Sequence, residues 1–338
     1  MDSLTHLFLG GAIVAAIAPR RHRGAALLAG AVLNSLPDLD VLPLELFSDD
    51  PVVQMTWHRA ATHSVFLLPI VGWLLWSAFR ARGGRVHQSP IRWFWAIQLA
   101  LLAHPLIDAC TVYGTSLLWP MDAAPTMGAT LFIADPLFTL PLIAACALGW
   151  RWRDERRGTL ALLAGLMTSA LYLALAFGAK AQVESVAQRA LDLRGLGDAP
   201  RFSVPMPFNI ALWRVVAMTP EGFVEGQRSV IADRGPMQFN RHTSDIASLQ
   251  AVHRFEAVRR LTRFNHGFQK AEVRGDQLVV CDLRMGVDPN YIFCFAVARR
   301  EAGRWSEIPP RQFDWPAANW GNQLRALWHR IWNEPDAE

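Results

Sequence analysis

The chain has 338 residues, of which 52% are hydrophobic and only 18% are charged. Soluble domains carry nearer a quarter of charged residues, so this composition is too apolar for an ordinary cytosolic enzyme. It also excludes intrinsic disorder, a fibrous repeat and a disulfide-dense miniprotein. Residues 1–180 hold only 13 of the 33 basic and 11 of the 29 acidic residues. This asymmetry predicts a membrane-embedded first half and a water-facing second half.

The net charge of +4 does not indicate a nucleic-acid-binding protein. The basic residues form short clusters beside apolar segments, and not a stripe with interleaved aromatic residues. The four cysteines form no CxxC pair, which disfavours a zinc ribbon or a thioredoxin-like site. The first apolar run has its basic flank after it and none before it, so no cleavable signal peptide is expected.

Six apolar segments can be drawn in residues 1–180. They lie at roughly 4–18, 24–36, 64–80, 91–109, 129–150 and 158–179. A membrane crossing takes about 20 residues of helix; the last four segments meet this length, and the first two are too short. The first two are either tilted helices or a re-entrant hairpin. The predicted fold class is therefore a membrane α-helical bundle of about six apolar helices, the first two short.

Three clusters of basic residues predict the orientation of these segments. They are Arg20-Arg21-His22-Arg23; Arg80, Arg82, Arg85 and Arg92; and Arg151, Arg153, Arg156 and Arg157. If the segments alternate, all three clusters fall on one side, which the positive-inside rule makes cytoplasmic. The N-terminus, the loops at 37–63 and 110–128, and everything after residue 180 are then expected outside the cytoplasm.

The second half has a different pattern. Residues 181–200 are predicted to be a linker, and residues 201–338 a small extracytoplasmic α+β domain. Alternating apolar runs predict strands at 210–218, 222–232, 277–283 and 291–298, and apolar stripes predict helices at about 244–262 and 322–333. Cys281 and Cys294 lie symmetrically about a predicted turn, where a disulfide and a pair of free thiols are both compatible with the sequence.

Histidines and aspartates of the first half gather at the predicted outward ends of its segments. The residues predicted to bind metal are His6, Asp38, Asp40, His58, His63, His104 and Asp108. Ionisable residues at membrane depth are costly and by default functional. Imidazoles and carboxylates without cysteine are ligands for zinc, manganese or iron. We therefore expect a divalent metal cofactor, with zinc the first choice.

The spacing of these residues favours a shared site. His104 and Asp108 are four residues apart, so a helix places them on one face. Asp38 and Asp40 would point the same way from an extended strand and bridge two ions. Seven ligands exceed the three of a catalytic zinc, so one or two ions are expected and two are favoured. Asp2 is left out of this set, because a role as the N-cap of the first helix explains it as well as metal binding does.

Four motifs follow one another over roughly residues 1–140: MDSLTHLFLGGAI, NSLPDLDVL, HRAATHS and HPLIDACTVYGTSLLWP. In these motifs the sequence resembles the YdjM-type family of inner-membrane, metal-dependent hydrolases. The resemblance implies a bound metal, a hydrolase activity with a poorly defined substrate, and a place in the bacterial inner membrane. The order of the motifs is also similar, more weakly, to zinc-dependent phospholipase C and the S1/P1 nucleases, which implies phosphoester chemistry.

The expected mechanism is attack of a metal-activated water on a phosphoester, with a membrane lipid as one candidate source. Asp38, Asp40 or Asp108 orients that water or takes its proton. Arg59 either neutralises the charge of a phosphate oxygen or is an interfacial residue whose side chain snorkels to the lipid headgroups. No HExxH or Gly-x-Ser-x-Gly motif supports a protease or a serine hydrolase.

One other function remains as an alternative. The same residues would suit a non-catalytic metal-binding membrane protein that recruits a partner through its C-terminal domain. A transporter is disfavoured, because it needs ionisable residues deep within several helices, and here they gather at one end. Expected partners are the lipid bilayer and a lipid or other phosphoester substrate.

Overall fold

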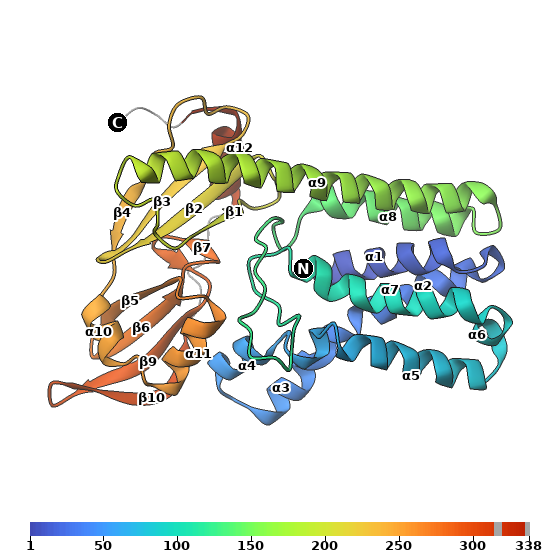
Figure 1. Ribbon diagram of the computed structural model, residues 1–338, viewed down its shortest axis with the longest axis horizontal. Coiled ribbons are helices and arrows are strands. Elements are labelled where there is room, and N and C mark those ends of the chain that lie inside the picture. The colour runs from blue at the N-terminus through green and yellow to red at the C-terminus, as the bar shows by residue number, and fades with distance from the viewer. Residues whose placement is uncertain (314–319, 335–338) are drawn as a thin grey trace. The chain divides into compact units, whose positions relative to one another are not determined.

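The computed structural model describes residues 1–313 and 320–334, and its chain divides into two compact units (Figure 1). The first unit comprises Met1–Pro43 and His58–Ala176, and the second comprises Leu44–Trp57 and Phe177–Glu338. Helix α9 runs from one unit into the other. The units are considered one at a time below.

The first unit is helical. Its longer helices are α1 (Ser3–Ile17), α2 (Arg23–Ser35), α5 (Leu67–Ala81), α7 (Pro90–Asp108), α8 (Pro136–Arg151) and the first part of α9 (Arg156–Asp192). Short elements are α6 (Gly84–Gln88), α3 (Val41–Phe47), which leads into the second unit, and 3-10 turns at Arg20–His22, Pro37–Asp40 and Ala61–His63. Helix α1 packs against α2, α7 and α8 and forms the middle of this unit.

Helices α1 and α2 meet at a pair of glycines. A Cβ on Gly10 would lie 2.2 Å from the carbonyl oxygen of Gly30, and a Cβ on Gly30 would lie 2.1 Å from that of Gly10. No larger residue fits at either position unless the helices separate. His6 and Asn34 lie one turn from this crossing on their respective helices, so the glycine contact brings these two polar side chains together.

The prediction of about six membrane-spanning helices is wrong. Among the described residues, one helix, α9, is long and apolar enough to cross a membrane, and at most three spans result if each of two bent helix pairs counts as one. Helices α1 and α8 have 15 and 16 residues. At 1.5 Å per residue they are about 22–24 Å long, against a hydrocarbon core of about 30 Å. Asp2 and Asp135 cap their N-termini and so mark where the two helices begin.

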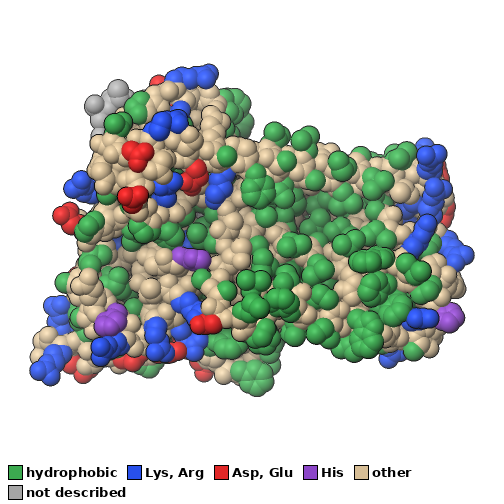
Figure 2. Space-filling model, viewed as in Figure 1, with side chains coloured by type: hydrophobic (Ala, Val, Ile, Leu, Met, Phe, Trp, Pro, Cys, Tyr) green, Lys and Arg blue, Asp and Glu red, His purple; other side chains and the backbone are tan. Residues whose placement is uncertain are grey.

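The helices of the first unit expose a broad apolar surface (Figure 2). Exposed large side chains include Ile70, Trp73, Leu74 and Phe79 on α5, Trp95, Leu99 and Leu106 on α7, and Leu160, Leu163, Met167, Leu171 and Leu175 on α9. From Gly158 to Ala179, α9 contains no charged residue, a length of about 33 Å. An apolar surface of this extent is suited to contact with lipid and not with water.

The second unit is a β-sheet domain with short helices, and not the predicted α+β domain. One antiparallel sheet has the order β1 (Arg201–Pro205), β2 (Leu212–Thr219), β3 (Gly222–Ser229), β4 (Asn240–Thr243). The other has the order β10 (Arg304–Gln312), β9 (Cys294–Glu301), β6 (Gln277–Asp282), β5 (Gln269–Arg274). The remaining elements are the hairpin β7 (Gly286–Val287) and β8 (Asn290–Tyr291) and helices α4 (Pro51–Trp57), α10 (Ile246–Ala251), α11 (Glu256–Phe264) and α12 (Trp320–Trp332).

Strand β2 has two buried faces. Trp213 and Val215 pack against Val183 and Ala187 of the C-terminal part of α9, which extends through most of the expected linker. The alternate residue, Arg214, lies on the other face, where it donates to Glu225 Oε2 at 2.6 Å and to a backbone carbonyl at 2.7 Å. A buried guanidinium with these acceptors has the partners that its charge requires.

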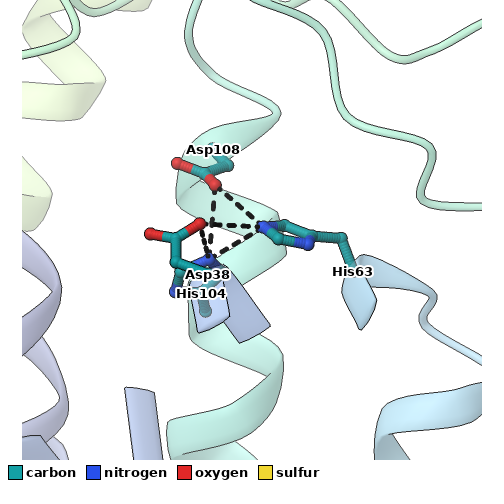
Figure 3. A group of neighbouring side chains, drawn as sticks. All are labelled: Asp38, His63, His104 and Asp108. Carbon is teal, nitrogen blue, oxygen red and sulfur yellow. Dashed lines mark hydrogen bonds and ion pairs between the residues drawn. The ribbon is translucent and has the colours of Figure 1, made fainter. Parts of the chain in front are cut away.

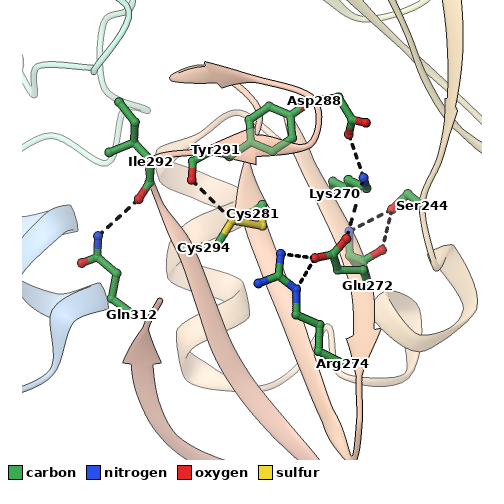
Figure 4. The surroundings of a disulfide bond; sticks show 11 residues. Ser244, Lys270, Glu272, Arg274, Cys281, Asp288, Tyr291, Ile292, Cys294 and Gln312 are labelled. Atoms are coloured by element: carbon green, nitrogen blue, oxygen red, sulfur yellow. Dashed lines mark hydrogen bonds and ion pairs between the residues drawn. A yellow bond between two sulfur atoms is a disulfide. The ribbon is translucent and has the colours of Figure 1, made fainter. Parts of the chain in front are cut away.

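Cys281 and Cys294 form a disulfide (Figure 4). They stand directly opposite each other on β6 and β9, at the end of the paired register. The bond closes the base of the segment that carries the β7–β8 hairpin. Of the two arrangements that the sequence allowed, the structure has the bridge.

Candidate metal centre

Four side chains converge on one point at one end of the helical unit (Figure 3). Asp38 comes from the 3-10 turn after α2, His63 from the 3-10 turn before α5, and His104 and Asp108 from the last turns of α7. One donor atom from each lies within 4.8 Å of all the others. In the described part of the chain, this is the one group of three or more such donors that comes together.

The histidine nitrogens that face this point carry lone pairs. His104 Nδ1 lies 2.5 Å from the backbone oxygen of Asn34 and donates its proton there. His63 Nδ1 lies 3.0 Å from the Thr62 hydroxyl, which itself donates to Asp40, so that hydroxyl accepts from His63. Both rings therefore present an unprotonated Nε2. These two nitrogens are 2.9 Å apart, a repulsive arrangement unless a cation lies among the donors.

The two carboxylates of the group also direct oxygens with free lone pairs toward the other donors. Asp38 Oδ1 and Asp108 Oδ2 are buried and accept no hydrogen bond. They lie 3.3–3.4 Å from His63 Nε2 and His104 Nε2. Tetrahedral ligands about 2.0–2.1 Å from a zinc ion are about 3.3–3.4 Å from one another. Two imidazoles and two carboxylates at this spacing could hold one metal ion.

Asp40 and His58 lie beside the cluster and not in it. Asp40 Oδ1 accepts from His58 Nδ1 at 2.8 Å, and Asp40 Oδ2 accepts from the Thr62 hydroxyl at 2.8 Å and the Arg59 amide at 3.0 Å. Both oxygens are thus occupied by donors of the 58–62 segment. Through Thr62, Asp40 fixes the ring of His63, which is how residues around a metal orient its ligands.

Replacing Asp40 with asparagine is expected to weaken metal affinity about 10–100-fold, because the amide offers one acceptor where the carboxylate offers two. Competition with a chromophoric chelator measures this affinity. Asp50→Asn is the matched control, since Asp50 caps α4 through the Val52 amide and does not contact the cluster. Equal affinities for Asp40→Asn and the wild type would rule out this supporting role.

His6 also lies beside the cluster. Its Nε2 is 3.2 Å from Asp108 Oδ1, the carboxylate oxygen that faces away from the four donors, and its ring stacks on His104 at 3.8 Å. The amino group of Met1 pairs with the same oxygen. Asn34 Oδ1 lies 3.1 Å from His6 Nδ1, and Asn34 Nδ2 donates to a carbonyl of α7. His6 therefore holds Asp108 in place.

Arg59 is the one arginine at this end of the first unit's described residues. Its side chain is 5% exposed, and its Nε lies 3.2 Å from Asp108 Oδ2. Its guanidinium lies over the Tyr113 ring at 4.9 Å, while Nη1 is buried without a hydrogen-bond partner. The side chain thus points inward beside the cluster, with a donor available for another oxygen.

Two further aspartates have structural positions. Asp2 caps α1 by accepting from the Thr5 amide at 3.1 Å. Asp135 caps α8 and accepts from the Tyr172 hydroxyl at 2.9 Å, which ties the start of α8 to α9. Burial raises the pKa of the Asp135 carboxyl. Neither belongs to the group of four.

Sequence reasoning did not identify Asn34 or Thr62 as part of the site. Both lie inside the motifs that supplied ligands, NSLPDLD and HRAATHS. Each supports a histidine through a hydrogen bond to Nδ1, Asn34 with its backbone oxygen and Thr62 with its hydroxyl. Their position as uncharged polar residues inside motifs that supply ligands could have indicated this supporting role.

The three basic clusters lie at the other end of the helices. His22 contacts Gln88 at 3.1 Å, which joins the α1–α2 turn to α6. Buried Arg23 donates to the carbonyls of Trp152, Arg153 and Glu155 in the α8–α9 turn. The loops that carry the exposed arginines therefore meet one another, one helix length from His104 and Asp108.

A family model described as YdjM inner membrane protein matches residues 1–183. The match covers more than half of the chain and includes all the residues of the metal centre. No curated protein and no solved structure matches, so the weaker likeness to zinc-dependent phospholipase C and the S1/P1 nucleases stays a prediction. With these four motifs and this extent of match, the chain belongs to the YdjM family of inner membrane proteins.

Proposed function

We propose that this protein is a membrane-bound, metal-dependent hydrolase of phosphoester bonds. The observation that carries the proposal is the group of four donors, in which two carboxylate oxygens and two imidazole nitrogens face one another with no proton between them. Asp38, His63, His104 and Asp108 would hold a divalent ion, which when bound would supply Lewis acidity and lower the pKa of a bound water toward neutrality.

Asp38 is the best candidate for the carboxylate that takes the proton from the attacking water. Both oxygens of Asp40 are occupied by donors, and Asp108 Oδ1 is paired with His6. The Asp38 side chain is 22% exposed, and its second oxygen points away from the cluster in Figure 3. It can therefore reach both the metal and the solvent side of the site, as a general base must.

Arg59 is proposed to bind a phosphate oxygen. Its buried Nη1 has no hydrogen-bond partner, and a planar guanidinium matches the geometry of two phosphate oxygens. Its Nε already contacts Asp108 Oδ2, so an oxygen bound at Nη1 would lie beside the four donors. This position favours charge neutralisation during phosphoester cleavage over a role at the lipid surface.

Metal analysis combined with turnover tests the proposed function. Detergent-purified protein should contain stoichiometric metal and hydrolyse bis(4-nitrophenyl) phosphate or 4-nitrophenyl phosphate, and a chelator should remove both properties until zinc or manganese is restored. Wild-type protein without stoichiometric metal would contradict the proposal. Metal without turnover of any phosphoester would favour the alternative, a metal-binding protein that recruits a partner through its C-terminal domain.

We also propose that the metal centre and the β-sheet domain lie outside the cytoplasm. Exposed arginines at the far end of the helices support this orientation by the positive-inside rule. The Cys281–Cys294 disulfide supports it as well, because such bonds persist in oxidising compartments.

Reporter fusions test this orientation. Alkaline phosphatase fused to the C-terminus is expected to be active, because it needs the oxidising side of the membrane. The same reporter inserted after Arg85, in a basic loop, should be inactive, and green fluorescent protein should give the opposite pattern. Phosphatase activity at Arg85 together with inactivity at the C-terminus would reverse the orientation.

A further inference from the structure

Helix α3, Val41–Phe47, is apolar except for the exposed Glu45, and it has no buried residue. Four of its side chains are exposed to water in the structure: Val41 by 38%, Leu42 by 56%, Leu46 by 83% and Phe47 by 87%. Single exposed apolar residues are common on any protein, whereas a contiguous group marks a surface that contacts something else. The helix begins at the residue directly after Asp40.

Val41 and Leu42, at the start of α3, belong to the helical unit that carries the apolar surface. Leu39, between the two aspartates, is 52% exposed, and Phe66, three residues after His63, is 47% exposed. From these positions exposed apolar residues continue along α2 at Val32 and along α5 at Ile70. The apolar surface suited to lipid therefore extends along the chain to the residues that flank the metal ligands.

The metal centre is least buried on this side. Asp38 is 22% exposed, whereas the side chains of His63, His104 and Asp108 are 0% exposed. Asp38 is bonded in sequence to Leu39, so the most accessible ligand adjoins an apolar, exposed residue. A small water-soluble phosphoester has no apolar group to contact these residues. The acyl chains of a lipid can contact them while its phosphate lies at the metal centre.

We propose that α3 inserts into the lipid–water interface and that the substrate is a phosphoester of a membrane lipid, which enters from the bilayer. The substrate class rests on the proposed function. In the reaction, the oxygen of water bonds to phosphorus, the ester P–O bond breaks, and the proton taken up by Asp38 passes to the leaving oxygen. A lipid is favoured over a protein partner because Leu39, Val41 and Leu42 belong to the same unit as the exposed apolar residues of α2 and α5.

Lipid contact can be measured without any activity. The photoreactive residue p-benzoylphenylalanine, placed at position 47 in full-length protein in nanodiscs of phosphatidylethanolamine and phosphatidylglycerol, is expected to crosslink to lipid. The matched control is position 193, because Leu193 is as exposed (86%) and lies in the connection between α9 and β1. Crosslinking at 47 to a second copy of the chain, or equal lipid crosslinking at both positions, would overturn the insertion of α3.

Turnover then tests the substrate class. With phosphatidylglycerol or phosphatidic acid in nanodiscs, the double variant Leu46→Ser, Phe47→Ser is expected to lower kcat/KM at least about tenfold, with bis(4-nitrophenyl) phosphate hydrolysis unchanged. Leu193→Ser should change neither rate. Hydrolysis of the soluble ester without hydrolysis of either lipid would overturn the lipid substrate and leave the proposed function standing. Failure to hydrolyse any of them would overturn both.

Discussion

Replacing His104 with alanine is expected to remove stoichiometric metal from the protein and, with it, phosphoester turnover. His104 Nε2 lies 2.9 Å from His63 Nε2 and 3.3–3.4 Å from the oxygens of Asp38 and Asp108, so it contacts every other donor of the group. Loss of a residue that only supports a ligand costs about 10–100-fold in metal affinity. Loss of this ligand should therefore cost more than 100-fold.

The matched control for His104→Ala is His22→Ala. His22 is also buried, at 5% exposure, and contacts Gln88 and Trp93 at the opposite end of the helices. Both variants remove a buried imidazole, but only the first removes a donor of the metal centre. Metal per chain is measured by mass spectrometry on monodisperse protein. Retention of a full equivalent of metal by His104→Ala would contradict the assignment of this cluster.

The shared position of two ligands on one helix could be predicted from sequence, because it depends only on their spacing along the chain. His104 and Asp108 are four residues apart on α7, and this spacing alone places them on one face. The 3.2 Å contact between His6 and Asp108 could not be predicted in this way. It depends on how α1 packs against α7, and no sequence pattern sets the register of two helices that lie far apart in the chain.

Asp38 and Asp40 show where a local assumption about the backbone misleads. In an extended strand, residues two apart point the same way, which suggested that both would face the metal. The segment Pro37–Asp40 is a 3-10 helix, in which residues two apart differ by about 240°. Asp38 consequently faces the four donors, and Asp40 faces His58 and Thr62.

The number of spans was overestimated for a related reason. The mean hydropathy of a window locates an apolar segment, but it does not show at which residue the helix in that segment begins. The predicted segment 129–150 yields a helix only from Pro136. Asp135 caps that helix, and Gly128 to Leu131 instead form backbone hydrogen bonds with Ala109 to Thr111, directly after α7. In the second unit, four strands (β1, β4, β5 and β10) were not predicted. Each pairs with a strand next to it in sequence, but its polar or mixed composition lacks the clear apolar run that marks β2, β3, β6 and β9.

Replacing Arg59 with methionine is expected to lower turnover roughly 100–1000-fold, the cost of losing one preorganised donor to developing negative charge. The metal should remain, because Arg59 contributes no donor atom to the four ligands. Methionine keeps most of the buried volume of the arginine stem. The change therefore removes the guanidinium, and with it the Nε contact to Asp108 and the unpartnered Nη1.

Arg59→Lys separates charge from geometry. Lysine restores a positive charge near Asp108 but not the two parallel N–H groups of the fork, so its turnover should fall between that of methionine and the wild type. A purely structural Arg59 would predict a different pattern, in which Arg59→Met lowers the thermal midpoint or the metal content along with activity. Wild-type turnover in Arg59→Met, with metal bound, would leave Arg59 as a packing residue beside Tyr113 and remove it from the catalytic proposal.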